Sequence, residues 1–252
     1  MGSMLDNNYF SKDPDSYRQF RPEYPAELFR YLAMLCNEHE LAWDVGTGSG
    51  QAAIGLAPHF EKVFASDISQ PQLKSAIRKS NINYYMGSAE NIKAVDGSID
   101  IITVGQALHW FDVEQFFEQV DRVLKPGGIL AVWCYELFNI NADLDLIIHN
   151  LYQKKLKDYW PTERKLVENG YKDITLPYPL IPVPEFSMEQ TWSFPQVIGY
   201  INTWTAVKNF IEQEEYNPVD QLLKKITFAW CDTGHMKKIK WPLNLMVCRK
   251  PD

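Results

Sequence analysis

The chain has 252 residues and a formal net charge of -7. An acidic chain of this kind lacks the basic surface that follows a phosphate backbone, so we expect no nucleic acid partner. No run approaches the ~20 apolar residues that span a bilayer, and the N-terminus lacks the regions of a signal peptide. We therefore expect a cytoplasmic protein without a membrane span, either a monomer or a homodimer. Because the four cysteines and five histidines are dispersed, we expect no metal site.

Strands and helices alternate in the first half of the chain. Apolar runs predict strands over residues 41–45, 62–66, 84–86, 99–104 and 129–133. Helices are predicted over residues 51–60, 71–79 and 113–124, the last with Asp112 as its N-cap and with Lys125-Pro126-Gly127-Gly128 after it. This alternation is typical of an α/β fold with a doubly wound, Rossmann-like sheet and right-handed crossovers.

The pattern changes in the second half of the chain. Amphipathic spacing predicts helices over residues 142–159 and 219–230. A final strand is predicted over residues 239–248, interrupted early by Pro242, and a strand near Ile174 would complete the sheet edge with it. Proline removes ladder donors, so the proline-rich segment 176–184 is not a central strand along its whole length. The aromatic segment at about 185–230 is expected to form a helical insertion on the substrate side.

The most informative motif is the turn Asp44-Val45-Gly46-Thr47-Gly48-Ser49-Gly50. Glycine takes positive φ angles and lets a ligand approach the backbone, so this turn suits a ligand held at the start of the following helix. Asp67 ends the next predicted strand, where its carboxylate can accept hydrogen bonds from two ribose hydroxyls. The turn and Asp67 together predict a nucleoside-binding site.

Two departures from the dinucleotide fingerprint favour S-adenosylmethionine over NAD. Gln51 stands where the third glycine of G-x-G-x-x-G would allow close helix packing. Asp44 precedes the turn, where it would repel a pyrophosphate but suit a cationic amino group. An NAD-dependent oxidoreductase and a glycine-rich turn without a ligand remain as alternatives.

Four motifs in this order resemble those of class I S-adenosylmethionine-dependent methyltransferases: the glycine-rich turn, Asp67, Ser88-Ala89-Glu90, and Leu124-Lys125-Pro126-Gly127-Gly128. Three further segments resemble the small-molecule subgroup that includes trans-aconitate methyltransferase: Tyr17 to Pro25, Gln106 to Phe111, and Thr203 to Ala206. The resemblance implies a mostly parallel seven-stranded sheet with an antiparallel last strand and an N-terminal helical segment. It also implies one methyltransferase domain over residues 1–252, with a cover at 1–38, a cofactor core at 39–135 and a C-terminal part at 136–252.

The resemblance also implies roles for single residues. Asp44 would face the cofactor ammonium, Asp67 the ribose hydroxyls, Ile68 the adenine and Arg21 the cofactor carboxylate, while Tyr17 would close over the methyl group. The implied cofactor-binding residues are Tyr17, Arg21, Asp44, Gly46, Thr47, Gly48, Asp67, Ile68, Ser88, Ala89, Glu90, Gly105 and Gln106. For Tyr17, Arg21, Ser88 and Glu90 a purely structural role remains open.

His109 is the candidate for proton chemistry, because it follows the fourth predicted strand, where open α/β sheets place their ligands. It could act as a base, contact the substrate or serve the structure alone. Trp110 and Trp204 are the other substrate-side candidates. A carboxylate is already ionised at neutral pH and needs no base, so orientation would then carry catalysis. We expect methyl transfer to a small molecule, as O-methylation of a carboxylate. A non-catalytic module that binds S-adenosylmethionine and regulates a partner is the remaining alternative.

Overall fold

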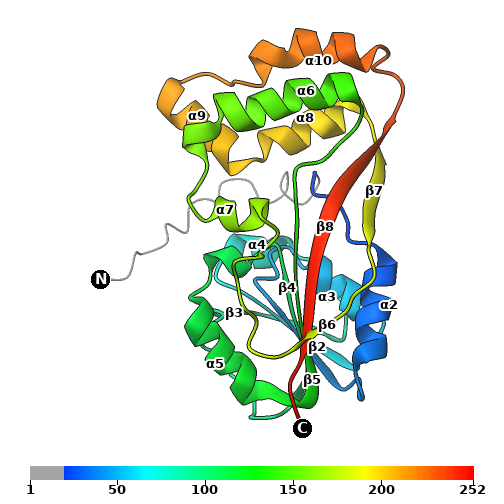
Figure 1. Cartoon of the computed structure of the whole chain (residues 1–252), viewed down its shortest axis with the longest axis vertical. Coiled ribbons are helices and arrows are strands. Elements are labelled where there is room, and N and C mark those ends of the chain that lie inside the picture. Colours follow the sequence, from blue (N-terminus) through cyan, green and yellow to red (C-terminus); the bar gives the residue numbers. More distant parts are fainter. Residues whose placement is uncertain (1–19) are drawn as a thin grey trace.

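The computed structural model describes residues 20–252, and Figure 1 shows a sheet below a layer of helices. Its strands are β1 (Leu41–Val45), β2 (Lys62–Asp67), β3 (Ile82–Met86), β4 (Ile99–Gly105), β5 (Leu124–Tyr135), β6 (Leu180–Ile181), β7 (Ser187–Trp192) and β8 (Lys237–Arg249). Their order is β3-β2-β1-β4-β5-β8-β6, and β7 pairs with β8 outside this path. The first five strands run parallel, whereas β8 is antiparallel to β5. The Rossmann-like fold class and the antiparallel last strand are therefore confirmed.

The helices lie in two groups. Those that alternate with the strands are α2 (Ala26–Leu35), α3 (Gln51–Leu56), α4 (Gln70–Ser75) and α5 (Val113–Val123), and the short α7 (Arg164–Glu168) comes after them. The upper group in Figure 1, which we call the helical layer, consists of α6 (Ala142–Asn150), α8 (Phe194–Asn202), α9 (Thr205–Glu214) and α10 (Leu223–Trp230). No helix in residues 20–252 is long and apolar enough to cross a bilayer.

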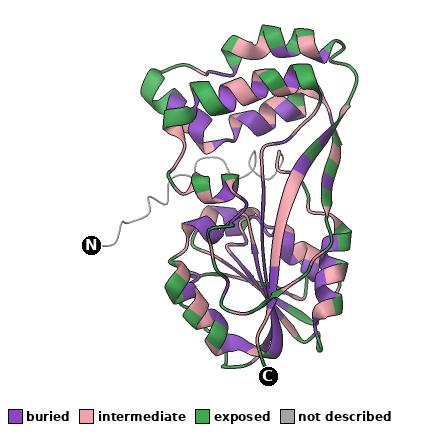
Figure 2. Ribbon diagram, viewed as in Figure 1, coloured by how far each residue is buried: buried purple, intermediate pink, exposed green. Residues whose placement is uncertain are grey.

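The central strands β1, β4 and β5 are largely buried, because helices cover both faces of the sheet (Figure 2). Side chains of β5 alternate between the two faces, as strand geometry requires. Ala131 and Trp133 pack with Leu32 of α2 and Leu56 of α3, whereas Val132 packs with residues of α5. A separate apolar cluster fills the helical layer and includes Tyr200, Trp204 and Trp241. The candidate site described below therefore lies on a sheet whose two faces are both packed against other side chains.

Several sequence expectations differ from the structure. The strand near Ile174 is wrong, because the chain turns through positive φ angles at Gly170 and Tyr171, and the edge strand is β6, only two residues long among prolines. The helix expected over residues 142–159 breaks after α6 into a π turn, η2 (Leu151–Lys155), and a 3-10 turn, η3 (Lys157–Tyr159). The helices expected over residues 51–60 and 71–79 end early, at Leu56 and Ser75. Strand β7 lies in the segment at about 185–230, for which only helices were expected.

Strand β8 runs without a break through Pro242, contrary to the expected interruption. Residues up to Pro242 pair with β7, and residues from Leu243 onward pair with β5. Proline has no N–H to give to a ladder, which suits the point where the strand changes partner. The same strand thereby joins the sheet to the helical layer (Figure 1).

Candidate cofactor and acceptor site

The glycine-rich turn after β1 is built on left-handed backbone. Gly46, Gly48 and Gly50 have φ angles of 66°, 55° and 88°. A Cβ atom on Gly46 would lie 2.6 Å from the Cβ of Ala107, and one on Gly50 would overlap the hydroxyl of Tyr84. Gly46 and Gly50 are therefore required by conformation and by space, and Gly48 by conformation.

The carboxylate of Asp44 is held inside this turn. One oxygen accepts hydrogen bonds from the Thr47 hydroxyl at 2.5 Å and the Ala53 N–H at 3.1 Å, and the other accepts from the Thr103 hydroxyl at 2.9 Å. These bonds join β1 to the start of α3 and to β4. The residue is only 1% exposed, and burial raises the pKa of its carboxyl from 3.8 to about 6 despite the hydrogen bonds.

Asp67 ends β2 beside the turn. Its two carboxylate oxygens accept from the Gly48 N–H at 2.8 Å and from the Ser69 N–H at 2.7 Å. Burial raises the pKa of this carboxyl. Ile68 follows it and is 45% exposed, which is unusual for a large apolar side chain and suits contact with a flat ligand ring. The carboxylate is thus fixed by backbone donors while part of it faces the cavity.

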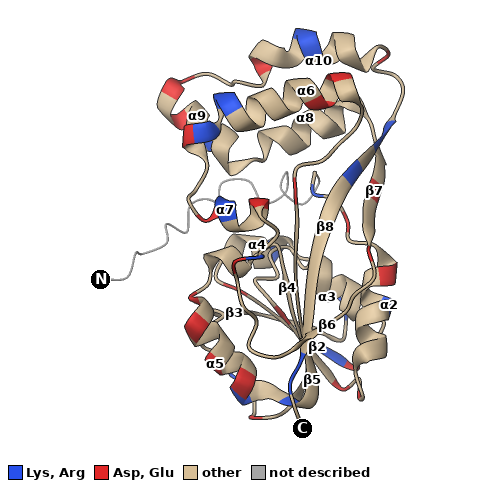
Figure 3. Ribbon diagram, viewed as in Figure 1, with Lys and Arg blue, Asp and Glu red and all other residues tan. Residues whose placement is uncertain are grey.

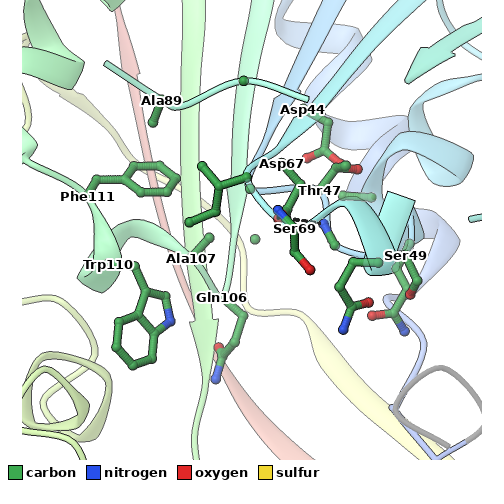
Figure 4. Close-up of a pocket in the computed structure, with 18 of the residues that line it drawn as sticks. Asp44, Thr47, Ser49, Asp67, Ser69, Ala89, Gln106, Ala107, Trp110 and Phe111 are labelled. Carbon is green, nitrogen blue, oxygen red and sulfur yellow. Dashed lines mark hydrogen bonds between the residues drawn. The ribbon is translucent and has the colours of Figure 1, made fainter. Parts of the chain in front are cut away.

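A cavity opens where the strands β1, β2 and β4 end (Figure 4). Ten of the predicted cofactor residues line it: Asp44, Gly46, Thr47, Gly48, Asp67, Ile68, Ala89, Glu90, Gly105 and Gln106. Trp110 and Phe111 stand opposite Asp44 and Thr47 in Figure 4. The structure therefore brings together the turn, Asp67 and the segment after β4, as the strand order predicts.

Nine other lining residues were not named as candidates: Tyr24, Ser49, Gln51, Ala52, Ser69, Gln72, Gly87, Ala107 and Tyr135. Phe111, in the Gln106 to Phe111 segment of the resemblance, also lines the cavity. Several adjoin a motif in the sequence, and Ser69 could have been found because it follows Asp67 by two positions. Tyr135 ends β5, so its place at the carboxyl edge was available as a signal. Tyr24 lies in the segment Tyr17 to Pro25 that the resemblance singled out, whereas Gln72 carried no signal in the sequence, since only the folded chain brings it to the turn.

Of the other three predicted cofactor residues, two are described by the structure and do not line the cavity. Tyr17 lies outside the described residues. Ser88 is partly buried in the loop after β3, and its carbonyl accepts from the Asn91 N–H at 3.4 Å. Arg21 donates from Nη1 to the hydroxyl of Tyr135 at 2.9 Å. Since Tyr135 lines the cavity, Arg21 stands behind its wall, facing the helical layer.

His109 also does not line the cavity, and its geometry does not support a base. It lies in the turn η1 (Leu108–Trp110), is 8% exposed, and its Nδ1 is 2.8 Å from the hydroxyl of Tyr171. Burial, with a smaller effect of the nearby Arg164 charge, lowers its pKa from 6.5 to about 3. A neutral, enclosed imidazole bonded to Tyr171 favours the third of the roles left open above, a structural one.

The two substrate-side tryptophans have different positions. Trp110 lines the cavity. Trp204 is 5% exposed inside the helical layer, with its ring 6.1 Å from that of Tyr200 and 5.8 Å from that of Trp160. Trp204 is therefore a packing residue above the cavity, whereas Trp110 forms part of the wall.

Gln106 combines a cavity position with a structural one. Its φ angle is 57°, uncommon for a residue with a side chain. The side-chain oxygen accepts from the Tyr135 N–H at 2.8 Å, and the side-chain nitrogen donates to the Tyr135 carbonyl at 3.3 Å. The amide thereby extends the β4–β5 pairing by one step and fixes Tyr135 at the cavity.

The cavity fits an adenosine-type cofactor. The Ser69 hydroxyl is buried, has no hydrogen-bond partner within residues 20–252, and projects toward the middle of the cavity in Figure 4. A buried hydroxyl in this state needs a partner from a ligand or water. It lies beside Asp67, whose carboxylate suits ribose hydroxyls. In the part of the chain that the structure describes, no group of three His, Cys, Asp or Glu residues could hold a metal ion.

Comparisons with known proteins agree with this geometry. Residues 43–132 match the family model of a methyltransferase domain. A putative methyltransferase from Dictyostelium discoideum is 32% identical over 248 residues, which cover 96% of this chain and 94% of that protein. The chain belongs to the class I S-adenosylmethionine-dependent methyltransferases. This membership makes S-adenosylmethionine the cofactor and decides against an NAD-dependent oxidoreductase.

Solved methyltransferase structures share the fold. A putative type II methyltransferase from Anaeromyxobacter dehalogenans superposes with a TM-score of 0.87 at 33% identity, over 92% of this chain and 100% of that one. A putative methyltransferase from Bacillus halodurans has a TM-score of 0.51 at 22% identity, over 90% of this chain and 99% of that one, and shows the fold alone. The long match to the first structure includes the helical layer as well as the sheet.

Proposed function

We propose that this methyltransferase acts on a carboxylate oxygen of a small molecule. The observation that carries the proposal is the absence of a basic side chain from the cavity wall. Within residues 20–252, no His, Lys or Cys lines it, and His109 is bonded to Tyr171 instead. An alcohol or a phenol must lose a proton as it is methylated, whereas a carboxylate is ionised at neutral pH.

The carboxylates that line the cavity are already engaged. Asp44 accepts three hydrogen bonds, Asp67 accepts two from the backbone, and Glu90 accepts one from the Asp112 N–H at 3.0 Å. All three belong to the cofactor end of the cavity. Cationic groups, Arg21 and Arg164, lie on the side of the helical layer, which favours an anionic acceptor there.

The residues of the chain would divide the work as follows. S-adenosylmethionine supplies an electrophilic methyl group, whose S–C bonding electrons stay on sulfur as the new O–C bond forms, with no proton transferred. Asp67 and Ser69 would hold the ribose, and Gly46 and Gly48 would let the methionine end lie against the backbone. Trp110 and Tyr135 would exclude water from the reacting oxygen. Rate enhancement would then come from orientation in a dry cavity.

The same division suggests how the chain is organised. We propose that residues 39–135 hold the cofactor and that residues 1–38 together with the helical layer cover the acceptor. The layer is built from α6 as well as from the segment at about 185–230, so it begins earlier in the chain than the aromatic pattern suggested. The resemblance to the trans-aconitate methyltransferase subgroup supports a small acceptor.

A labelled-methyl assay tests the proposal. The protein is incubated with methyl-tritiated S-adenosylmethionine and panels of small carboxylic acids, phenols and quinone precursors. We expect transfer to a carboxylic acid, giving a product whose label is released as methanol by mild alkali, as methyl esters are and aryl ethers are not. The rate should change little between pH 6 and 9. Label found only in alkali-stable products of phenols would refute the carboxylate assignment.

A binding control separates catalysis from regulation. Calorimetry with S-adenosylhomocysteine measures whether the cofactor cavity is functional, independently of any acceptor. Tight binding without transfer to any member of a broad panel would favour the regulatory module that the sequence left open.

A further inference from the structure

Arg164 is a cation close to the cavity that forms no ion pair with any carboxylate of residues 20–252. It begins α7, which packs against the turn η1 that contains Trp110, a residue of the cavity wall. The side chain is partly buried, and Figure 3 shows α7 between the strand ends and the helical layer. Its charge is therefore held near the place where an acceptor would lie.

The guanidinium of Arg164 is fixed on one side only. Its Nε donates to the Tyr152 hydroxyl at 2.8 Å, and its central carbon lies 5.6 Å from the Tyr152 ring centroid and 5.1 Å from that of Trp160. The Tyr152 hydroxyl in turn donates to Glu168 at 2.8 Å. The two Nη atoms have no hydrogen bond to any residue that the structure describes. The two Nη groups of the planar guanidinium can thus donate hydrogen bonds to a ligand.

A purely structural arginine does not account for this arrangement. Removing a guanidinium from water is unfavourable unless an anion or full hydrogen bonding compensates for it. Glu168, the nearest acidic partner in this network, bonds to Tyr152 and makes no ion pair with Arg164. A methionine or leucine would pack on the rings of Tyr152 and Trp160 without that loss. Since no residue within 20–252 pairs with the Nη atoms, this arrangement points to an anionic ligand.

Aromatic rings connect Arg164 to the cavity. The Trp160 ring stacks near Trp204 at 5.8 Å, and Trp204 is 6.1 Å from Tyr200. The Tyr200 ring lies 5.6 Å below the guanidinium of Arg21, which bonds to the cavity residue Tyr135. Burial raises the pKa of Tyr200 and lowers that of His109; the charge of Arg164 partly opposes the first shift and adds to the second, as expected of a cation near both residues.

We propose that Arg164 binds an anionic group of the methyl acceptor, with Tyr152 as the residue that positions its guanidinium. The planar fork suits the two oxygens of a carboxylate. An acceptor that carries one carboxylate for Arg164 and another for methylation, a small dicarboxylate, fits best. This inference rests on the proposed function, because it assigns the substrate side of the same site.

Binding measurements test the inference without relying on turnover. The protein, saturated with S-adenosylhomocysteine, is titrated with succinate, fumarate, glutarate and adipate, and with their diamides as neutral controls. We expect at least one dicarboxylate to bind and the diamides not to bind. Arg164→Met should weaken that binding at least tenfold, and Arg164→Lys less, because a lysine keeps the charge but loses the fork. Affinity for S-adenosylhomocysteine should stay within twofold.

Two further variants control the result. Lys165→Met removes an exposed cation one position along α7 and should leave dicarboxylate binding unchanged. Tyr152→Phe keeps the ring but removes the hydroxyl that fixes Nε, so it should raise the acceptor KM severalfold with little change in kcat. If Arg164→Met fails to fold, Tyr152→Phe and Arg164→Lys carry the test.

The outcomes distinguish this inference from the proposed function. A wild-type protein that binds no dicarboxylate, or an Arg164→Met protein that binds as the wild type does, overturns the role of Arg164. Transfer of labelled methyl to carboxylic acids that is independent of Arg164 also overturns it, yet leaves the proposed function intact. Arg164-dependent binding without methyl transfer to any carboxylic acid would support the anion site and reject the methylation of a carboxylate oxygen.

Discussion

Replacement of Asp44 by Asn should stabilise the folded protein at neutral pH and weaken cofactor binding. The carboxyl is 1% exposed and bonded to Thr47, Ala53 and Thr103. Asparagine keeps its shape, and its oxygen can accept from Ala53 and Thr47 while its nitrogen donates to the Thr103 hydroxyl. The change therefore removes a buried charge without leaving a cavity.

The magnitude follows from the pKa of Asp44, which burial raises from 3.8 to about 6. A shift of about 2 units corresponds to roughly 3 kcal/mol of folding free energy. The folded state holds the proton more tightly than the unfolded state does. The contribution of Asp44 is thus fully favourable below pH ~4, declines as the pH rises, and is lost once the pH passes ~6.

Urea unfolding at intervals from pH 4 to 8 measures the effect. The free energy of unfolding of Asp44→Asn minus that of the wild type should increase by up to ~3 kcal/mol across this range and level off above pH ~7. Asp112→Asn, at an exposed helix N-cap, controls for the loss of one surface charge. Curves for Asp44→Asn and the wild type that stay parallel from pH 4 to 8 would refute the reasoning.

Ligand binding extends this prediction to the cofactor. If Asp44 faces the ammonium of the cofactor, binding favours its ionised form, so the affinity of the wild type for S-adenosylhomocysteine should rise as the pH increases from 5 to 7. In Asp44→Asn the affinity should be lower and nearly independent of pH over that interval. Equal pH dependence in both proteins would mean that the ammonium is held elsewhere.

Three further changes have expected outcomes. Asp67→Asn would place a side-chain NH2 group, a donor, next to the backbone N–H of Gly48 or Ser69, which is also a donor. Calorimetry should show an affinity for S-adenosylhomocysteine about 10- to 100-fold lower, or ~1.5–3 kcal/mol. Gly50→Ala forces a left-handed alanine against Tyr84 and should lower the unfolding free energy by ~2–4 kcal/mol, more than Gly97→Ala, where nothing lies within 4 Å; equal losses would contradict this. His109→Ala should lower the unfolding free energy by ~1–3 kcal/mol, because Tyr171 loses its partner, yet leave the pH profile of methyl transfer unchanged; a wild-type fall in rate at low pH that is lost in the variant would restore the base role.

The fold and the cofactor end of the site could be predicted because their signals are local. The apolar run of β4 and the Asp112 N-cap of α5 appear where the sequence places them, and Asp112 accepts from the Gln115 N–H at 3.2 Å. The predictions that failed concern strands whose formation depends on pairing with a segment far away in the sequence. Strand β7 carries alternating polar residues and exists because it pairs with β8. The strand expected at Ile174 moved to β6, where β8 offers an open edge.

The acceptor end of the site shows the same limit more strongly. The sequence placed His109 after β4, but a single turn of 3-10 helix decides which way its ring faces, and Tyr171, 62 positions away, supplies the partner. Arg164 was not singled out, since nothing near it in the sequence shows that its Nη atoms lack an anion. Tyr135 gained its place through the side chain of Gln106.

By itself the sequence determined the cofactor turn. The positive φ angles of Gly46, Gly48 and Gly50 are properties of a short segment, and so is the carboxylate at the end of the next strand. The order of these motifs along the chain places them at the same edge of the sheet. The tertiary structure alone decided which groups surround the cavity. The burial of the Ser69 hydroxyl without a partner in residues 20–252, and the packing of Arg164 on Tyr152 and Trp160, arise only when separate segments meet, and no local pattern encodes them.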